Sequence, residues 1–264
     1  MLVSVENRGQ PEAWTVSIER IKERMNLEGA NVLDIGFGIG GFSLALANEG
    51  AVLVNLDISL KAIERMKGRG DALFHSQLAS GVTLPYREST FDLIILNGVL
   101  EYTAQGQKGS PKDTHIKILK YVRRLLKRGG LFYLGIENRY YLKFLLGFRD
   151  HYEMRFSNIL PRWLSTFISK YILKNEVRNW IYSYNGYLRL LSEAGFNYPR
   201  FFTALPNYKS PEYITPIEDK ERIKENILKL NTRRLYRYVV YALAHSNYLY
   251  KKIGPDFVVL SGAY

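Results

Sequence analysis

A glycine-rich segment between two apolar stretches constrains the fold of this chain more than any other feature of its sequence. The segment Gly36-Phe37-Gly38-Ile39-Gly40-Gly41 follows a short apolar run at 31–35 and precedes a helix pattern of small residues at 42–48. Glycines at this spacing let the backbone turn sharply out of a strand and open the N-terminus of a helix to a ligand. The sequence therefore predicts a strand–turn–helix unit that binds a ligand at its turn.

The rest of the first half repeats this alternation of strand and helix. Short apolar runs that predict further strands lie at 51–56, 72–75, 91–96 and 131–136. Amphipathic patterns between them predict helices at 58–67 and 113–126. Such alternation is typical of a parallel sheet with helices on both faces, so we expect an α/β, doubly wound, Rossmann-like core.

Two carboxylates near the glycine turn decide between two ligands. Asp57 ends the second predicted strand, where a dinucleotide-binding enzyme places the acid that binds its ribose, so an NAD(P) oxidoreductase is one interpretation. Asp34, however, lies two residues before Gly36 and would repel a pyrophosphate at this helix start. S-adenosylmethionine carries an ammonium and a sulfonium instead, so the charge favours that cofactor.

Five segments, in the expected order, resemble the motifs of the class I S-adenosylmethionine-dependent methyltransferases. They are Val32–Gly40, Asp57, Leu84–Ile94, Asn97–Tyr102 and Leu125–Gly130. The resemblance implies a seven-stranded sheet, mostly parallel with the last strand antiparallel. It also implies that the glycines lie against the methionine part of the cofactor and that Asp57 accepts hydrogen bonds from the ribose hydroxyls.

The resemblance places the cofactor site at the ends of the first four strands. The residues expected to form it are Asp34, Gly36, Gly38, Gly40, Asp57, Ile58, Gln77, Ser80, Asn97 and Gly98. Many members of the family carry Asp or Glu near the adenine, where this chain has Ser80. We expect Ser80 or Gln77 to bind the adenine amino group instead.

The methyl acceptor is expected to bind just after the strand at 131–136. Glu137 and Asn138 stand at the tip of that strand, where open α/β sheets bind ligands, although a strand-capping role is the alternative. Arg139 and Tyr140 follow as further acceptor-binding candidates. His151 is the candidate general base for the acceptor proton, and a packed loop histidine is the alternative interpretation.

The second half resembles a bacterial and archaeal subgroup of these enzymes associated with glycosyltransferases and surface-polysaccharide synthesis. The segments concerned are IENRYYLKFLLGFRDHY, LPRW, YSYNGYLRLLSEAGF and ALPNYKSPEY. This implies O-methylation of a small acceptor, a sugar or a lipid-linked sugar. Residues 139–178 hold eight Lys or Arg against three acids, which suits an anionic or phosphate-linked acceptor.

Two segments allow either packing or binding. Leu160–Ile172 is an amphipathic helix pattern that we expect to pack on the core as a cap, with contact to a membrane surface as the alternative. Arg233–Tyr241 interleaves basic and aromatic residues, as RNA-binding surfaces do, although a solvated helix face explains it equally well. An RNA methyltransferase and a non-catalytic binding protein with a methyltransferase fold therefore remain alternatives.

Composition narrows the remaining choices. The chain has 264 residues, a net charge of +12 and no cysteine, which favours an anionic partner and excludes disulfides and Cys-ligated metals. Its four histidines lack metal-ligand spacing, so no metal site is predicted. We expect no signal peptide and no transmembrane helix, and therefore a cytoplasmic protein.

The same patterns suggest three regions. Residues 1–137 are expected to form the S-adenosylmethionine-binding core, and residues 138–183 a helical cap rich in aromatic and basic residues. Residues 184–264 are expected to complete the core with a helix and strands six and seven. A helical insertion at 207–254 interrupts that last region.

Overall fold

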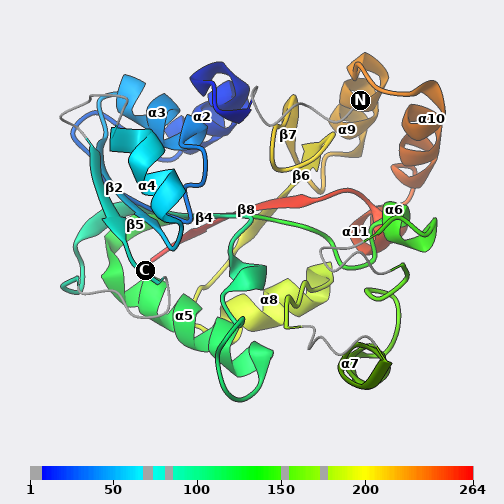
Figure 1. Cartoon of the computed structure of the whole chain (residues 1–264). Coiled ribbons are helices and arrows are strands. Elements are labelled where there is room, and N and C mark those ends of the chain that lie inside the picture. The colour runs from blue at the N-terminus through cyan, green and yellow to red at the C-terminus, as the bar shows by residue number, and fades with distance from the viewer. Residues whose placement is uncertain (1–7, 68–73, 81–85, 150–154, 173–177, 264) are drawn as a thin grey trace.

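A single eight-stranded mixed sheet with helices on both faces forms the core of the protein (Figure 1). The computed structural model describes residues 8–67, 74–80, 86–149, 155–172 and 178–263. The strands, in chain order, are β1 (Asn31–Ile35), β2 (Val52–Asp57), β3 (Phe74–Leu78), β4 (Phe91–Asn97), β5 (Leu126–Ile136), β6 (Arg200–Leu205), β7 (Tyr213–Pro216) and β8 (Phe257–Gly262). The expected α/β Rossmann-like fold is confirmed.

The strand order is β3-β2-β1-β4-β5-β8-β6-β7. The strands β1 to β5 are parallel, and β8 runs antiparallel between β5 and β6. The described sheet therefore contains the seven expected strands with the last one antiparallel, and β7 adds an eighth at the edge through an antiparallel hairpin with β6. The prediction of seven strands missed β7 because its four residues, YITP, end in proline and carry too short a strand pattern.

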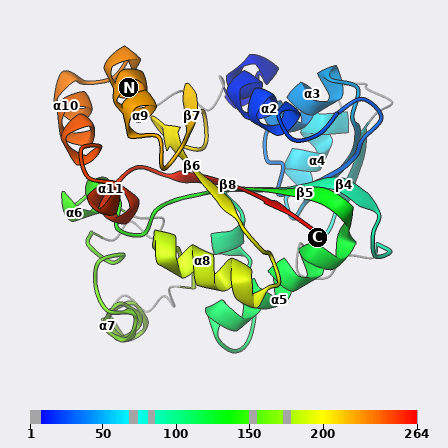
Figure 2. The ribbon, with the colours of Figure 1, turned by 180° about the vertical axis from the view of Figure 1, so that it is seen from behind.

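Helices cover both faces of the sheet, as Figures 1 and 2 show. On one side lie α2 (Thr15–Lys22), α3 (Gly41–Asn48) and α4 (Leu60–Lys67), with a 3₁₀ turn at Pro11–Trp14 leading into α2. On the other side lie α5 (Pro111–Leu125) and α8 (Tyr184–Glu193).

The central strand β4 shows why the sequence requires this arrangement. Leu93 and Ile95 pack into the apolar cluster beneath α2 and α3, whereas Ile94 and Leu96 pack into the cluster beneath α5 and α8. All four side chains are fully buried. A strand segment buried on both faces is apolar at every position, and this explains the apolar run Leu93–Leu96.

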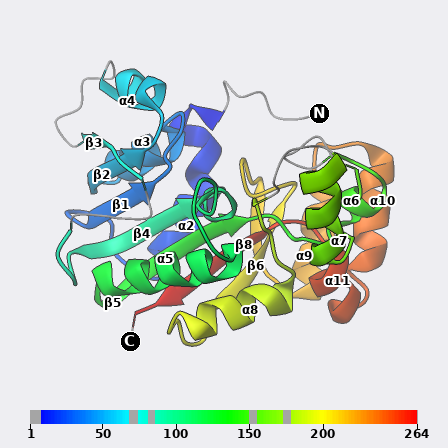
Figure 3. The same ribbon diagram turned by 60° about the horizontal axis from the view of Figure 1, so that its bottom comes forward.

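The remaining helices lie beyond the carboxyl end of β5 (Figure 3). Residues 138–183 hold α6 (Leu142–Leu145), α7 (Arg162–Phe167) and a π-helical segment at Ile168–Ile172. Residues 207–254 hold β7, α9 (Lys220–Lys229), α10 (Arg234–Leu243) and α11 (Asn247–Ile253). No helix in the described part of the chain is long and apolar enough to cross a membrane.

One feature of the cap differs from the sequence-based expectation. The aromatic residues of α7 and its π-helical extension do not pack on the core: Trp163 is 72% exposed, Phe167 is 52% exposed and Tyr171 is 64% exposed. The prediction that this stripe covers the catalytic domain is therefore wrong for its aromatic members. The physical reason is that the inward side of the helix is formed by the buried residues Ser165 and Ser169.

Candidate active site

The carboxyl ends of the parallel strands meet at one edge of the sheet. The register pairs Ile35 of β1 with Leu56 of β2 and with Leu96 of β4, while Asn97 of β4 pairs with Gly135 of β5. The turn after β1 and the residues after β2, β4 and β5 are thus neighbours at this edge. Open α/β sheets bind their ligands at such an edge.

The glycine turn leaves room for a ligand at one of its three positive-φ positions. Gly36, Gly38 and Gly40 have φ values of 73°, 59° and 80°. A Cβ on Gly36 would overlap the side chain of Val99, and one on Gly40 would overlap Met66. A Cβ on Gly38, in contrast, would meet only the carbonyl oxygen of Gly36, at 4.0 Å, so Gly38 borders open space.

Hydrogen bonds hold Asp57 beside this open space. Its Oδ2 accepts a hydrogen bond from the backbone N–H of Gly38 at 3.0 Å, and its Oδ1 accepts one from the N–H of Ser59 at 2.8 Å. The carboxylate is therefore fixed between the glycine turn and the start of the next loop. A carboxylate oriented in this way can also accept hydrogen bonds from vicinal hydroxyls.

Asp34 provides a second carboxyl group beneath the turn. It is 3% exposed, and Ser43 Oγ donates a hydrogen bond to its Oδ2 at 2.7 Å. The pKa of Asp34 is raised to about 7: burial is the largest cause, the Ser43 hydrogen bond opposes it, and the negative charge of Asp57 adds to the rise. A neighbouring cation would favour the ionised form, so the site fits a ligand that carries an ammonium or sulfonium group.

Exposed apolar side chains flank the ends of β2 and β3. Ile58 is 79% exposed, and Leu78, which the register places opposite Asp57, is also exposed. Such side chains suit the flat apolar face of an adenine ring. Sequence analysis missed Leu78 because the strand predicted there ended at residue 75.

Gln77 and Ser80, the polar residues expected near the adenine, lie in β3 and just after it, close in sequence to Leu78. Gln77 and Ser80 are exposed, and Gln77 Oε1 accepts a hydrogen bond from Tyr86 Oη at 2.7 Å. The amide N–H₂ of Gln77 and the hydroxyl of Ser80 stand within the same short segment. Their contact with the adenine stays a prediction.

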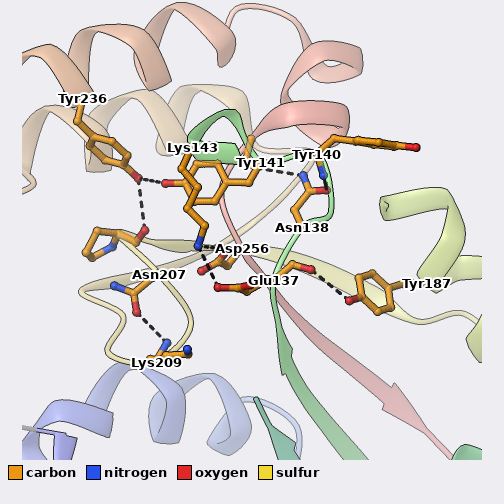
Figure 4. A network of polar contacts seen from close by, with 12 residues as sticks. Glu137, Asn138, Tyr140, Tyr141, Lys143, Tyr187, Asn207, Lys209, Tyr236 and Asp256 are labelled. Atoms are coloured by element: carbon orange, nitrogen blue, oxygen red, sulfur yellow. Dashed lines mark hydrogen bonds and ion pairs between the residues drawn. The ribbon is translucent and has the colours of Figure 1, made fainter. Parts of the chain in front are cut away.

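A buried polar cluster lies at the carboxyl end of β5 and the adjacent amino end of β8 (Figure 4). Lys143 Nζ donates a hydrogen bond to Glu137 Oε1 at 3.0 Å and stands 3.9 Å from Asp256 Oδ1. Both acids are buried. Burial and the charge of Glu137 raise the pKa of Asp256, with Lys143 acting in the opposite direction.

Lys143 stays protonated in this cluster. Burial lowers the pKa of its ammonium group, but the charges of Asp256 and Glu137 outweigh that effect and raise the pKa above its usual value. The cluster thus places two carboxyl groups around one cation. It is a low-dielectric site that can take up a proton.

Tyr208 extends this cluster toward the end of β4. Its side chain is buried against Gly98 and Gly135, where a Cβ would come within 2.7 Å of Tyr208 Oη and 3.1 Å of its ring, respectively. Tyr208 Oη and Asn97 Oδ1 have no hydrogen-bond partner among the described residues. Two buried polar atoms without partners at the end of β4 are therefore available to a bound acceptor.

The surroundings of Tyr208 are acidic. Burial raises its pKa well above the usual value for a tyrosine, and the charges of Glu101, Glu137 and Asp256 raise it further. Sequence analysis missed Tyr208, Lys143 and Asp256, since they are distant in sequence and carry no motif. Tyr208 lies within the segment ALPNYKSPEY, whose resemblance to the glycosyltransferase-associated subgroup gives Tyr208 itself no role.

The other predicted acceptor-binding residues have structural partners. Asn138 is fully buried, and its Nδ2 donates hydrogen bonds to the carbonyl oxygens of Gly254 and Lys252 at 3.0 and 3.3 Å. Arg139 donates to the carbonyl oxygens of Asn158 and Leu160 at 2.8 and 2.9 Å.

These contacts hold the cap and the loop before β8 onto the end of β5. They agree with the alternative, strand-capping role of Asn138. The Arg139 guanidinium also stands 5.0 Å from the centre of the Tyr140 ring. Acceptor binding by Asn138, Arg139 and Tyr140 stays a prediction. His151 lies outside the described residues, and its role as general base stays a prediction too.

The interleaved basic and aromatic residues of α10 largely serve internal contacts. Tyr236 Oη shares a hydrogen bond of 2.8 Å with Tyr141 Oη and donates to the carbonyl oxygen of Pro206 at 3.3 Å. Arg237 donates to carbonyl oxygens at the end of α9, and Arg234 donates to Tyr238 Oη. This pattern favours the packing interpretation over the RNA-binding one for these residues.

Comparison with known proteins agrees with the geometry of the site. Residues 33–134 match the family model of a methyltransferase domain. The ubiquinone biosynthesis O-methyltransferase of Coxiella burnetii (strain RSA 493 / Nine Mile phase I) is 28% identical over 186 residues, which cover 69% of this chain and 74% of that protein.

Solved structures share the fold. An S-adenosylmethionine-dependent methyltransferase from Mesorhizobium loti superposes with a TM-score of 0.57 at 16% identity, covering 95% of this chain and 97% of the other. Phosphoethanolamine N-methyltransferase 2 of Haemonchus contortus, bound to S-adenosylhomocysteine, superposes with a TM-score of 0.54 at 18% identity, over 96% of this chain and 53% of the other.

The fold and the site at its carboxyl edge define a class I methyltransferase. The protein is an S-adenosylmethionine-dependent methyltransferase, and S-adenosylmethionine is its methyl donor. The two acids that flank the glycine turn, Asp34 and Asp57, fit this cofactor, whereas Asp34 does not fit the pyrophosphate of NAD(P). Among the described residues, no group of three or more acidic or histidine side chains could hold a metal ion.

Asp57→Ala is expected to weaken S-adenosylmethionine binding by about ten- to a few hundredfold. The substitution removes the carboxylate that would accept the ribose hydroxyls, and a hydrogen bond to a charged group contributes about 1.5–3 kcal/mol. Isothermal titration calorimetry measures the change. Glu88→Ala is the control because it removes an exposed carboxyl near the start of β4, at the opposite edge of the sheet, and unchanged affinity in Asp57→Ala would contradict the assignment.

Asp34→Asn is expected to separate stability from cofactor binding. The folded-state pKa of about 7 lies above the ordinary value of 3.8, so the free energy of unfolding falls as pH rises from about 4 to 7. The substitution removes this effect and should raise the free energy of unfolding at pH 8, by up to about 4 kcal/mol, but not below pH 4. Urea unfolding at both pH values measures it.

The same variant should bind S-adenosylmethionine at least about tenfold more weakly, because a neutral amide does not attract the cationic ligand. Calorimetry at pH 8 measures this loss. A variant that is both less stable at pH 8 and unchanged in affinity would contradict the proposed electrostatic role of Asp34.

Proposed function

We propose that this methyltransferase transfers the methyl group to a hydroxyl oxygen of a small, sugar or lipid-linked acceptor. The acceptor would lie over the carboxyl ends of β4 and β5 and the amino end of β8. One observation carries the proposal: the buried cluster of Glu137, Lys143 and Asp256 continues to Tyr208 and Asn97. Tyr208 Oη and Asn97 Oδ1 have no hydrogen-bond partner among the described residues.

In the cofactor half of the site, we propose that Asp57 holds the ribose and that Asp34 stabilises the cationic methionine part. Gly36, Gly38, Gly40 and Gly98 would keep the backbone close to the ligand. Ile58 would cover the adenine, Gln77 or Ser80 would bind its amino group, and Asn97 would face the reacting groups. The open space beside Gly38 and the exposed side chain of Ile58 support this arrangement.

The bound cofactor supplies an activated methyl group on a positively charged sulfur. The protein has to align the acceptor and receive the proton that leaves its hydroxyl group. The carboxyl pair Glu137–Asp256 is suited to receive that proton, because burial and the neighbouring charge of Glu137 raise the pKa of Asp256. Tyr208 Oη would hold the acceptor oxygen in line, and His151 remains an alternative base.

The similarity to an enzyme named as an O-methyltransferase supports an oxygen acceptor. The resemblance of the second half to the subgroup associated with glycosyltransferases supports a sugar or lipid-linked acceptor.

The acceptor class can be tested directly. Methyl-labelled S-adenosylmethionine is incubated with the protein and separate panels of phenols with isoprenoid tails, glycolipids, free sugars, amines and RNA. We expect label in the hydroxyl compounds. Label in amines or RNA would overturn the oxygen proposal, and S-adenosylmethionine binding without label in any panel would contradict an acceptor of these hydroxyl classes.

Glu137→Gln is expected to lower kcat by about 10²–10⁴-fold, and Tyr208→Phe by about tenfold. In both variants the affinity for S-adenosylmethionine should change by less than about twofold. The first removes a proton acceptor and the second removes one hydroxyl group. Tyr198→Phe is the matched control because Tyr198 is exposed between α8 and β6. Loss of cofactor affinity, or full turnover, in either variant would exclude that residue from the acceptor site.

A further inference from the structure

The outward face of α7 is apolar and its inward face is polar, which is the reverse of a helix that packs on a core. Trp163, Phe167 and Tyr171 recur at intervals of four residues and are all exposed, and the rings of Phe167 and Tyr171 lie 5.0 Å apart. Ser165 and Ser169 are buried, and each returns its hydroxyl group to a backbone carbonyl of its own helix. The aromatic stripe therefore has no partner within the described fold.

Contacts on the inward side fix this orientation. Arg162, at the start of α7, donates a hydrogen bond to the carbonyl oxygen of Ile181 and stands 4.8 Å from the centre of the Trp180 ring. Arg139 binds the carbonyl oxygens of residues 158 and 160 just before the helix. The helix is anchored from inside, so its aromatic face is held outward.

A second group of exposed apolar residues precedes α7 in the same cap. Leu146, Phe148 and Phe156 are exposed, and the bridge between Arg149 and Arg155 brings the last two close together. We call these three residues, with Trp163, Phe167 and Tyr171, the cap surface. Exposed aromatic groups of this size mark interaction sites.

The exposed charge of the described cap is positive. Of the six Lys or Arg in residues 138–172, Arg149, Arg155 and Lys170 are exposed, whereas the other three make the inward contacts described above; the two acids of this range lie outside the described residues. Arg155 and Lys170 are exposed beside the aromatic side chains, and Lys170 Nζ stands 5.5 Å from the centre of the Tyr171 ring. Aromatic residues combined with basic residues are typical of helices that lie in the interface of an anionic bilayer.

We infer that the cap surface is a peripheral membrane-binding surface for a bilayer that contains anionic lipids. The aromatic side chains would enter the headgroup region, and the basic side chains would contact lipid phosphates. No helix of the described chain crosses the membrane in this arrangement. The inference rests on the cap alone and does not depend on the identity of the methyl acceptor.

The test is cosedimentation of the full chain with vesicles of phosphatidylcholine alone and of phosphatidylcholine with 30% phosphatidylglycerol. We expect binding to the anionic vesicles that weakens with added salt, and little binding to the neutral ones. The triple variant W163S/F167S/Y171S should bind at least about tenfold more weakly. Lys170→Glu, which retains the aromatic stripe, should bind about five- to tenfold more weakly.

Two controls keep these outcomes distinct. Tyr198→Ser removes an even more exposed aromatic residue outside the cap and should bind vesicles like the unmodified protein. S-adenosylmethionine affinity, measured by calorimetry, should be the same in all variants, which shows that they fold. The inference would be overturned if the protein did not bind vesicles, or if both cap variants bound them as well as the unmodified protein does. It would also be overturned if sedimentation showed a dimer that the triple variant dissociates.

Discussion

Negative charge buried at the carboxyl edge of the sheet is the constraint on which the rest of the site depends. Asp34 lies under the glycine turn with only the Ser43 hydroxyl as a described hydrogen-bond partner, and burial raises its pKa to about 7. A carboxylate in that position is unfavourable until a cation lies beside it. In the proposed arrangement a cationic cofactor would offset this cost, and the same charge would disfavour a pyrophosphate.

Buried carboxyl groups also lie in the proposed acceptor half of this edge, where a lysine partly neutralises their charge. Glu137 and Asp256 stand at the ends of neighbouring antiparallel strands, and Lys143 reaches back from α6 to neutralise part of their charge. The pair remains able to take up a proton because one cation faces two carboxyl groups. In the proposed mechanism α6 would thus contribute to the chemistry as well as to the cover of the site. Tyr208 connects this cluster to the end of β4.

The sequence predicted what local patterns encode. Motif spacing predicts the strand–turn–helix unit around Gly38 and the position of Asp34 and Asp57 near its turn. The apolar runs predict the parallel core. The sequence could not predict the cluster of Lys143, Tyr208 and Asp256, because these residues meet only when β8 inserts between β5 and β6. The aromatic stripe of α7 was placed inward for a related reason: periodicity defines an apolar face but does not say which way that face points.

A crystal structure with S-adenosylhomocysteine tests the central claim most directly. The account predicts both ribose hydroxyls within about 3.2 Å of the Asp57 carboxylate and the amino group of the ligand on the side of Asp34. It also predicts that the sulfur faces the space between Asn97 and Tyr208. A ligand whose sulfur faces away from Tyr208 and Glu137, or whose ribose lies clear of Asp57, would contradict it.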